Sequence, residues 1–391
     1  MTGVLERLGV TPVINACGPV TRLGGGLMEP AVAAAMAETS RVCCDMLDLQ
    51  AAACRLIRRV TGAEAGIVTS GASAGVLLGA AACLAGLDPG RMNRLPKVRD
   101  GRREVVVVRS QRNMYDRALV VAGARLVEIG IPDRFSGPGV RDAAAWEVED
   151  AIGPETAAIY YLAQPQSQPA LGDVAAAAHR RGVPVLVDAA AQLPPVDNLR
   201  AYLAQGADLV AFSGGKAIGG PQASGILCGR ADLVGSALLQ MLDLDVRHEG
   251  WRLPPEFDAL TQVRGLPHHG IGRSCKVGKE EIVGLLVALE RFTDPNAGER
   301  LAGWTRVLQG VVEAAGTIEN VTLTIDDRGP VPVLRVRAGH AAQIAAALRT
   351  GNPAIECGTA SVEDGVLTFS PVALAPEHGA IIGERLRAVA A

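Results

Sequence analysis

The chain has 391 residues, enough for a large domain and a smaller one with separate hydrophobic cores. Its net charge of −3 and pI near 6.1 exclude a strong general attraction to nucleic acid or to an anionic membrane. Hydrophobic residues make up 49% of the chain and aromatic residues only 3%, so Ala, Val, Leu and Ile must build the cores.

The N-terminal part combines an irregular stretch with a helical one. Residues 1 to about 25 are rich in Gly and Pro and end in a loop of three glycines, 24–26. A helical pattern follows from about Glu29 to Val60, and Gly62 is suited to end it.

Short β-branched runs then alternate with Ala-rich helical segments. The runs lie at 66–70, 104–108, 125–130, 157–162, 183–188 and 208–214. Short apolar strands separated by helices are typical of a parallel sheet covered by helices on both faces. Gly/Pro-rich stretches at 132–139 and 250–272 are candidate linkers.

A long helix is expected from Lys279 to Phe292, and after it a smaller unit reads helix, strands, helix. We therefore expect an α/β fold in three parts. An N-terminal arm and helix would cover 1–45, a large domain 46–292, and a small C-terminal α/β domain 293–391.

Several features indicate a cytoplasmic protein. Eight cysteines show neither CxxC spacing nor a Cys/His zinc pattern, so no metal site is expected and most thiols should be buried. The first residues lack the layout of a signal peptide. The uncharged segment Ala65–Leu87 is long enough to span a bilayer, but Ser70, Gly71 and Ser73 break it into strand, turn and helix.

Three features fall at the carboxyl ends of predicted parallel strands, where ligands of such sheets collect. The first is Lys216, in AFSGGKAIGGP, three residues after Ser213. A lysine among glycines at a strand end suits a Schiff base with an aldehyde cofactor, and Ser213 could bind a phosphate. A solvated loop lysine is the simpler alternative for Lys216 taken alone.

The second feature is Asp188, which ends the apolar strand VPVLVD. A carboxylate there should be partly buried and needs a positive partner, such as a protonated pyridine nitrogen. Ala190 is small enough to lie flat against the ring. Helix N-capping is the alternative role for Asp188.

The third feature is the turn Ser70, Gly71, Ala72, Ser73 between a strand and an Ala-rich helix. Free N–H groups at a helix start, with two hydroxyls, form an anion site, although small residues there can also serve packing. Together the three features supply a phosphate site, a pyridine partner and a Schiff-base lysine in chain order. The sequence therefore predicts pyridoxal 5′-phosphate (PLP) as cofactor.

Five stretches carry a resemblance to a known family: VINACGPVTRLGGG, TGAEAGIVTSGASAG, GVPVLVDAAAQLPP, DLVAFSGGKAIGGPQASGIL and GIGRSCKVGKEEIVGLLVALE. They resemble the selenocysteine-synthase-like branch of fold-type I PLP enzymes, and within it the D-glucosaminate-6-phosphate ammonia-lyases. The resemblance implies that Lys216 is the Schiff-base lysine and Asp188 the pyridine partner. It also implies that residues 70–73 and Ser213 bind the phosphate, and that the protein is a homodimer or a larger homo-oligomer.

Two positions depart from the family pattern. Relatives tend to carry His where this chain has Gln111, at a position suited to covering the ring face. Gln111 would stack less well and cannot act as a general base. Relatives also often carry Arg near the segment NPAIECG, where this chain has Glu356 and Cys357.

Substrate binding is expected in the region 245–276. Arg273, in GIGRSCK, can offer a bidentate fork to an α-carboxylate, or it forms an ordinary salt bridge. His248, His268 and His269 lie in predicted loops and could protonate a leaving group, with a structural or merely exposed role as the alternative for each of them. His179 ends a predicted helix and suits the negative end of its dipole.

The expected reaction is elimination from a β-hydroxy or β-substituted amino acid, giving a 2-oxo acid and ammonia. Lys216, released by the substrate amine, would remove the Cα proton while Asp188 keeps the pyridine nitrogen charged. β-Replacement and racemisation share the early steps and stay open. Selenium transfer to seryl-tRNA is disfavoured, because the chain enters LGVTPVINACG almost at once and has no basic surplus. A non-catalytic PLP-binding protein is the alternative of another class.

Overall fold

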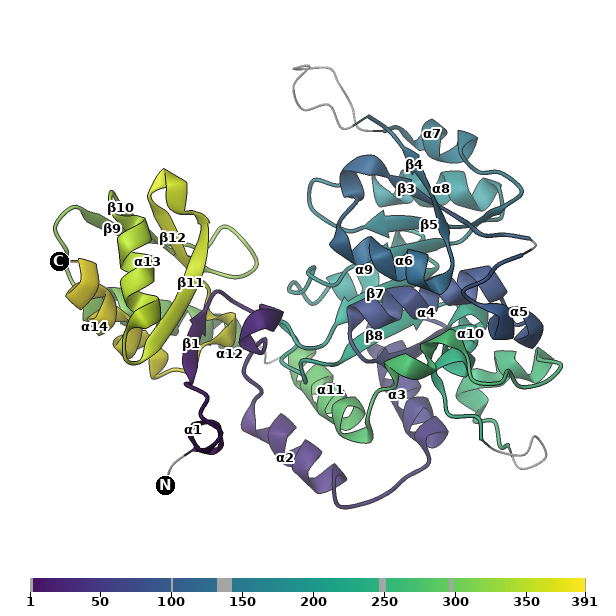
Figure 1. Cartoon of the computed structure of the whole chain (residues 1–391), viewed down its shortest axis with the longest axis horizontal. Helices are drawn as coiled ribbons and strands as arrows, with labels where there is room; N and C mark the ends of the chain where they lie inside the picture. Colours follow the sequence, from purple (N-terminus) through teal and green to yellow (C-terminus); the bar gives the residue numbers. More distant parts are fainter. Residues whose placement is uncertain (1–2, 100, 132–142, 246–250, 295–297, 391) are drawn as a thin grey trace. The chain divides into compact units, whose positions relative to one another are not determined.

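The computed structural model describes residues 3–99, 101–131, 143–245, 251–294 and 298–390. The chain divides into two compact units (Figure 1). The smaller unit comprises Met1–Glu29, Gly215–Gln222 and Glu290–Ala391, and the larger unit comprises Pro30–Gly214 and Ala223–Leu289.

A seven-stranded sheet forms the centre of the larger unit, in the order β2-β8-β7-β6-β5-β3-β4. Its strands are β2 (Ala65–Thr69), β3 (Glu104–Val108), β4 (Arg125–Ile129), β5 (Thr156–Leu162), β6 (Val185–Asp188), β7 (Leu209–Ser213) and β8 (Gly225–Gly229). The pairs among β3, β4, β5, β6 and β7 are parallel, whereas β8 runs antiparallel to both of its neighbours. All six predicted strands of this sheet are confirmed, and β8 is an additional strand that the alternation did not reveal.

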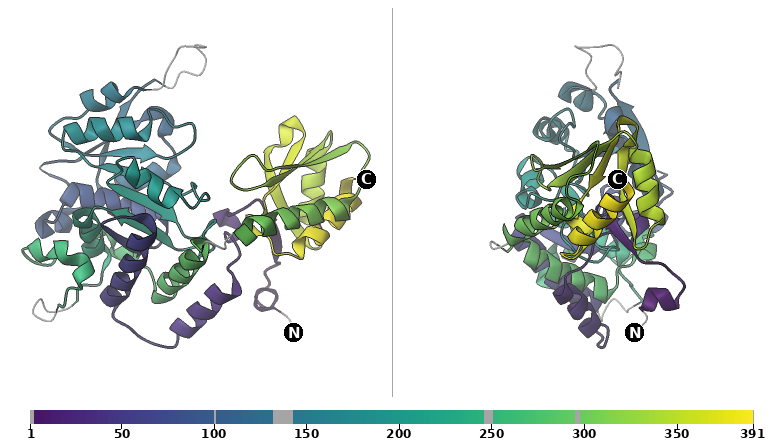
Figure 2. Two further views of the ribbon diagram at one scale, coloured as in Figure 1. Left: turned by 180° about the vertical axis from the view of Figure 1, so that it is seen from behind. Right: turned by 90° about the vertical axis from the view of Figure 1, so that its left-hand side faces the viewer.

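Helices cover both faces of this sheet (Figures 1 and 2). The chain moves toward β4 through α4 (Ala72–Ala85) and α6 (Arg117–Ala122), and back through α7 (Ala145–Asp150), α8 (Leu171–Arg180) and α9 (Asn198–Ala204). Right-handed crossovers in opposite directions place these two groups on opposite faces. The unit also contains α2 (Pro30–Thr39), α3 (Met46–Thr61), α5 (Pro89–Arg94), α10 (Ala231–Met241), and most of α11 (Lys279–Phe292).

The segment from Glu29 to Val60, predicted as helical, forms two separate helices, α2 and α3. Asp45 starts α3 as its N-cap, since its carboxylate accepts the amide N–H groups of Leu47 at 2.7 Å and Asp48 at 3.2 Å. Gly62 ends α3 in the left-handed conformation, with φ 75°, as predicted. The helix expected from Lys279 to Phe292 is confirmed as α11.

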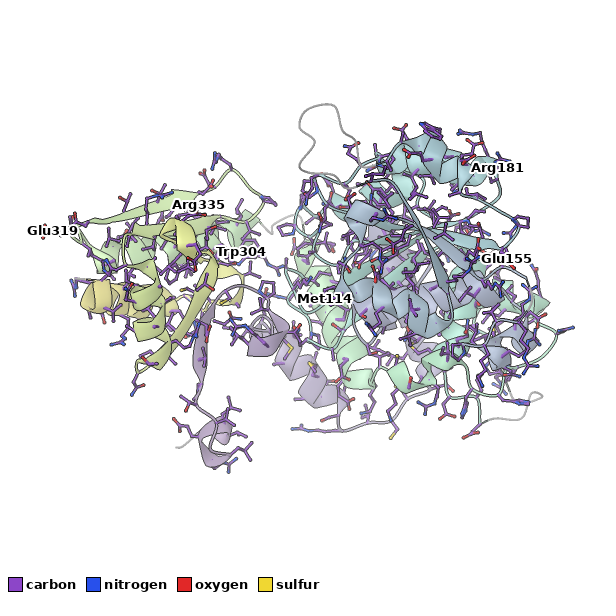
Figure 3. The ribbon with its side chains drawn as sticks, turned by 45° about the horizontal axis from the view of Figure 1, so that its top comes forward. Met114, Glu155, Arg181, Trp304, Glu319 and Arg335 are labelled. Atoms are coloured by element: carbon purple, nitrogen blue, oxygen red, sulfur yellow. The ribbon has the colours of Figure 1, made fainter. Side chains whose placement is uncertain are left out.

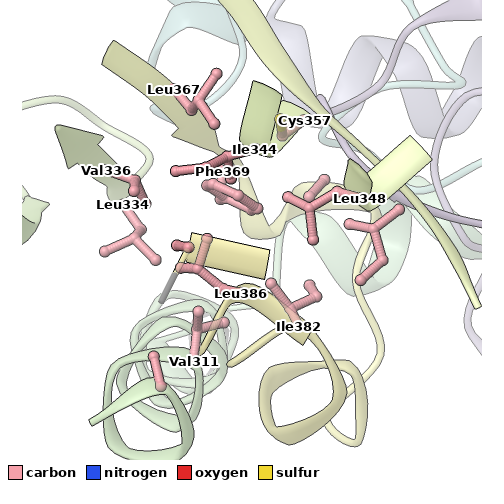
Figure 4. Close-up of a cluster of buried hydrophobic side chains, with 14 of the residues drawn as sticks. Val311, Leu334, Val336, Ile344, Leu348, Cys357, Leu367, Phe369, Ile382 and Leu386 are labelled. Carbon is pink, nitrogen blue, oxygen red and sulfur yellow. The ribbon is translucent and has the colours of Figure 1, made fainter. Parts of the chain in front are cut away.

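The smaller unit has a five-stranded sheet in the order β1-β11-β12-β10-β9. Its strands are β1 (Val13–Ala16), β9 (Val321–Asp326), β10 (Val333–Ala338), β11 (Ala354–Ser361) and β12 (Val366–Phe369). Side chains of α12 (Gly298–Ala315), α13 (Ala341–Thr350) and α14 (His378–Ala390) form one buried cluster with the strands (Figure 4). Because β1 pairs with β11, the N-terminal arm is part of this unit.

All eight cysteines are free thiols, but only Cys54, Cys228 and Cys357 are buried, so the expectation that most of them are buried is wrong. Within the described ranges, the structure contains no helix that is both long and apolar enough to cross a membrane.

Candidate active site

The carboxyl ends of β2, β7, β6, β5 and β3 meet at one edge of the larger sheet. Because β8 is antiparallel to both neighbours, Gly225 at its start is paired with Thr69 on one side and Ser213 on the other. Asp188 is paired with Leu162 and with Ala211. The fold therefore gathers the Ser70–Ser73 turn, Ser213, Asp188 and Gln111 along this edge, as parallel-strand geometry predicts.

The turn before α4 depends on two glycines. Gly71 has φ 108°, a conformation that residues with a side chain rarely adopt. A Cβ at Gly225 would lie 2.5 Å from the carbonyl carbon of Gly71 and 2.7 Å from the amide nitrogen of Ala72. Glycine at 225 is thus required for the start of α4 to approach the sheet. The first N–H groups of α4 have no acceptor within the helix, and N–H groups at a helix start, together with the helix dipole, favour a negative charge.

The Ser70 side chain links this turn to the segment that carries Arg273. Its hydroxyl donates to the carbonyl of Cys275 at 2.8 Å, so the 3₁₀ helix Ile271–Cys275 lies beside the turn. Ser73 is exposed on the first turn of α4. A groove of about 460 Å³ opens here, and its lining includes Ser70, Ser73 and Met114. Met114 is 83% exposed at the surface of the larger unit (Figure 3).

Asp188 is buried, with 5% of its surface exposed, and each of its carboxylate oxygens accepts a hydrogen bond. The Tyr160 hydroxyl donates to Oδ2 at 3.0 Å, and the amide N–H of Ala190 donates to Oδ1 at 3.0 Å. Burial, followed by the negative charge of Asp188, raises the pKa of Tyr160 well above its usual range. The phenol therefore stays protonated and acts as a donor. Sequence reasoning missed Tyr160, although a tyrosine in a buried strand signals that its hydroxyl has a partner.

Gln111 is 3% exposed, and both ends of its amide are bonded to backbone. Its Nε2 donates to the carbonyl of Gln168 at 3.1 Å, and its Oε1 accepts the amide N–H of Leu162 at 3.1 Å. The side chain thus has one orientation at the end of β5, the strand next to Asp188. Its contact with a cofactor ring stays a prediction.

Lys216 belongs to the smaller unit, where side chains from distant segments hold its loop. Arg300 of α12 donates through Nη1 to the carbonyl of Ala217, the residue after Lys216, at 2.9 Å. The Arg300 guanidinium also pairs with Glu29 at 3.0 Å and lies 5.4 Å from the centre of the Phe292 ring. Lys216 itself is half-buried. Sequence reasoning missed Arg300, because Arg300 lies far from Lys216 in the chain and no motif links the two residues.

A second contact fixes the far end of the lysine loop. Gln222 donates from Nε2 to the hydroxyl of Thr21 at 3.1 Å. The N-terminal arm and α12 therefore both hold the loop, 215–222, in the smaller unit.

The predicted substrate residues lie in the larger unit beside acidic groups. Arg273 donates to Asp243 at 2.8 Å and is 31% exposed, so the salt bridge considered for it is present. His269 has φ 51°, and its Nε2 lies 3.8 Å from Asp243 and 3.6 Å from Asp245. The three potential metal-ligand atoms of His269, Asp243 and Asp245 lie within 4.8 Å of one another, but both carboxylates are exposed. His248 lies outside the described residues.

A cavity of about 660 Å³ in the larger unit is lined by Arg273 and Asp243, whereas His269 and Asp245 line a separate pocket. The cavity lining includes the cations Arg252, Arg273, Lys276 and Lys279, together with Asp243. His268 is exposed, and its amide N–H donates to Asn93 at 2.7 Å. The four cations of this cavity share its lining with the three carboxylates of Asp45, Asp48 and Asp243, and Arg273 is paired with Asp243.

Glu356 and Cys357 take different positions on β11 of the smaller unit. Glu356 pairs with Arg22 and with Arg349, each at 3.1 Å. Cys357 is buried, and burial raises the pKa of its thiol to about 12.

His179 lies at the end of α8 in the larger unit, and its Nε2 is 2.8 Å from the Asp208 carboxylate.

Comparison with known proteins gives consistent matches. The family model of L-seryl-tRNA selenium transferase, SelA, matches residues 13–247. The 5′-C-glycyluridine monooxygenase-decarboxylase of a Streptomyces species is 31% identical over 97% of this chain and 90% of its own length. The D-glucosaminate-6-phosphate ammonia lyase of Salmonella typhimurium is 30% identical over 99% of this chain and 98% of its own length.

A solved structure that bears the same enzyme name as the Salmonella relative also matches this chain. The structure of D-glucosaminate-6-phosphate ammonia-lyase covers 100% of this chain and 98% of its own, with 30% identity and a TM-score of 0.80. The L-seryl-tRNA(Sec) selenium transferase of Moorella thermoacetica is 29% identical, but the match covers 61% of this chain and 53% of that protein.

Proposed function

The chain belongs to the L-seryl-tRNA selenium transferase family, and on this premise we propose that it eliminates the β-substituent of an amino acid, releasing a 2-oxo acid and ammonia. The expected family, the fold-type I α/β fold and the PLP cofactor are confirmed by these matches. The expectation of a PLP-dependent lyase of the ammonia-lyase type is confirmed as well. The full-length agreement with D-glucosaminate-6-phosphate ammonia-lyase in sequence and fold carries the proposal.

The residues at the carboxyl edge fit PLP. The absence of a Cβ at Gly225 lets the start of α4 approach the sheet, and the first N–H groups of α4, with the Ser73 and Ser213 hydroxyls, would hold the phosphate. The Asp188 carboxylate, held by two donors, would pair with the pyridine nitrogen. Ala190 leaves room for the ring, and Gln111 would lie over its other face.

Each of these residues then has a distinct task. When bound, PLP supplies an electron sink for the negative charge that develops at the substrate Cα. Lys216 would hold the cofactor covalently at rest and afterwards serve as the base that takes the Cα proton. Asp188 keeps a positive charge on the pyridine nitrogen. A hydrogen bond to the charged carboxylate favours this state.

Substrate groups would meet the cations of the larger unit. Arg273 would bind the α-carboxylate, in exchange with its present partner Asp243. His269 or His248 would donate the proton that the leaving β-substituent needs. The His269 ring lies 3.8 Å from Asp243 and 3.6 Å from Asp245, so two carboxylates fix the place of this ring in the larger unit.

A second candidate function is oxidative decarboxylation, because the Streptomyces relative, 31% identical to this chain, is a monooxygenase-decarboxylase. We propose testing loss of CO₂ from an amino acid with consumption of O₂. β-Replacement and racemisation use the same first proton transfer, and a non-catalytic PLP-binding protein would show no turnover at all.

We also propose that the protein acts as a cytoplasmic homodimer or larger homo-oligomer on a small-molecule amino acid. The net charge of −3 supports the proposal that nucleic acid is not a partner. Light scattering of the purified holoprotein measures its mass in solution, and a monomer of 40.4 kDa would contradict the oligomer.

The test is a substrate panel with PLP-loaded protein. It contains D-glucosaminate, its 6-phosphate, and both enantiomers of serine and threonine, with 2-oxo acid, ammonia, CO₂ and O₂ measured in parallel. We expect 2-oxo acid and ammonia in equal amounts from at least one β-hydroxy amino acid. Lys216→Ala should be inactive, and Lys97→Ala, a lysine outside the proposed site, should be unaffected. CO₂ release with O₂ uptake would replace the lyase by the second candidate.

A further inference from the structure

We propose that Tyr160 is a positioning residue that keeps the Asp188 carboxylate ionised and aimed, and thereby keeps the pyridine nitrogen of the cofactor protonated. The inference rests on the proposed role of Asp188. It adds a residue to the site that neither the glycine-rich loops nor the lysine motif suggests.

The geometry begins with the register of two parallel strands. Leu162 of β5 is paired with Asp188 of β6, and Tyr160 is paired with Leu186. Side chains two residues apart on a strand point to the same face, so Tyr160 lies diagonally across from Asp188 on one face of the sheet. The tyrosine ring spans this diagonal, and its hydroxyl reaches Asp188 Oδ2 at 3.0 Å.

The two oxygens of Asp188 are held from two directions. Oδ1 accepts the Ala190 N–H at 3.0 Å, and this contact ties the carboxylate to the backbone just after β6. Oδ2 accepts the Tyr160 hydroxyl, and Tyr160 is 1% exposed. With both contacts made, rotation of the carboxylate would break at least one buried hydrogen bond.

Burial, and after it the carboxylates of Asp188 and Asp116, keep the Tyr160 hydroxyl protonated by raising its pKa. Asp116, 4% exposed, contributes to raising the pKa of Tyr160 after burial and Asp188. Arg112 pairs with Asp116. The phenol therefore remains a donor, and its proton stabilises the ionised Asp188 rather than the neutral form.

The chemical consequence has a definite sign. A hydrogen bond to a charged carboxylate contributes more than one to a neutral group. Removing the Tyr160 hydroxyl therefore raises the proton affinity of Asp188, and a proton shared with a neighbouring pyridine nitrogen shifts toward the carboxylate. The ring would lose positive charge and become a weaker electron sink.

The test uses holoprotein loaded with PLP that carries ¹⁵N in its ring. The ¹⁵N chemical shift reports the protonation of that nitrogen without any turnover. Tyr160→Phe keeps the ring volume and removes only the hydroxyl. Tyr161→Phe is the matched control, because Tyr161 is also buried in β5 but points to the opposite face.

We expect a protonated nitrogen in wild type and Tyr161→Phe, and a shift toward the unprotonated value in Tyr160→Phe. The kcat of Tyr160→Phe should fall about 10-fold, with KM changed less than about 2-fold, since one pKa unit corresponds to a factor of ten. If Tyr160→Phe does not fold, a fluorinated tyrosine at 160 replaces it. A more acidic phenol is a stronger donor, so the ring nitrogen should keep its proton up to a higher pH than in the wild-type protein, which a pH series of the ¹⁵N shift measures.

The outcomes separate the two levels of inference. An unprotonated nitrogen in wild type would overturn the proposed role of Asp188 itself. A protonated nitrogen that is unchanged in Tyr160→Phe would leave that role intact and overturn the one assigned to Tyr160. Where Phe cannot be studied, a fluorotyrosine protein whose nitrogen loses its proton at the same pH as wild type would do the same.

Discussion

Replacing Asp188 by Asn removes one charge from the proposed site while keeping its shape. The amide oxygen can still accept one of the two hydrogen bonds, from Tyr160 or Ala190. Removing the whole carboxylate, as in Asp188→Ala, leaves both buried donors unpaired, at roughly 1–3 kcal/mol each, so that variant should lose about 2–6 kcal/mol of unfolding free energy. Asp188→Asn should lose much less stability.

The effect on activity should be the larger one for Asp188→Asn. Without a carboxylate, the pyridine nitrogen loses the partner that keeps it protonated, and each pKa unit corresponds to ~1.4 kcal/mol. A drop in kcat on the order of 100-fold or more is expected, because the transition-state charge at Cα loses its sink. PLP content should stay near wild type, since the residues proposed to hold the phosphate are untouched.

Asp208 provides the matched control, because it is also buried, at 8% exposure, and lies at the amino end of β7 instead of the carboxyl edge. Its carboxylate accepts the Val185 N–H at 2.8 Å. Asp208→Asn should lower stability without a specific loss of kcat. Steady-state rates, PLP absorbance and urea unfolding of both variants complete the assay. Near-normal turnover in Asp188→Asn would refute the reasoning and leave Asp188 a structural residue.

Three further predictions follow from other contacts. Arg300→Gln should lower unfolding free energy by about 1–3 kcal/mol and reduce PLP retention, measured by urea unfolding and absorbance, because the Ala217 carbonyl loses a charged donor. Arg273→Ala should raise KM for every amino acid substrate, because roughly 2–4 kcal/mol of binding free energy is lost. Arg273→Lys should recover only part of this binding free energy, and steady-state kinetics measures both variants. Burial raises the pKa of the Cys83 and Cys228 thiols to about 12 from 9.0, so native thiols keep protons that unfolded thiols lose. The unfolding free energy should therefore fall as pH rises from about 9 toward 12, measured by urea unfolding.

Each of these has a control on the same chain. Arg306→Gln changes an exposed arginine of the same helix as Arg300. If Arg306→Gln lost as much PLP as Arg300→Gln, this would contradict the proposal that Arg300 holds the lysine loop. Arg264→Lys alters an exposed ion pair with Asp88, 3.1 Å long, and should leave KM unchanged. If Arg273→Ala bound substrate normally but lost PLP, the residue would belong to the phosphate site. Cys83→Ala should make the decline above pH 9 less steep.

The sheet could be predicted because its strands are short apolar runs separated by helices. Asp188 was recognisable for the same reason, since a carboxylate that ends an apolar strand must lie at the carboxyl edge. The interruption before α3 was missed because the apolar pattern continues through a break that Asp45 caps. The strand β8 was missed because it runs against its neighbours and follows the glycine-rich lysine loop.

The contacts that hold the site could not be read from the sequence. Tyr160 reads as one residue of a buried strand, and only the register with β6 identifies its partner. Arg300 reaches the lysine loop from a helix far along the chain. The residue type of Arg273 does not decide between a substrate ligand and a salt-bridge partner, and the structure shows an ion pair with Asp243. The domain limits at residues 46 and 293, and the roles of the site residues, stay predictions.

The covalent attachment of the cofactor tests the central claim most directly. The chain has four lysines, Lys97, Lys216, Lys276 and Lys279, so borohydride reduction of the yellow holoprotein followed by peptide mapping gives an unambiguous position. We predict that the pyridoxyl group is found on Lys216 alone and that Lys216→Ala protein carries none. A pyridoxyl group on another lysine of the wild-type protein, or continued reduction onto the Lys216→Ala protein, would contradict the account.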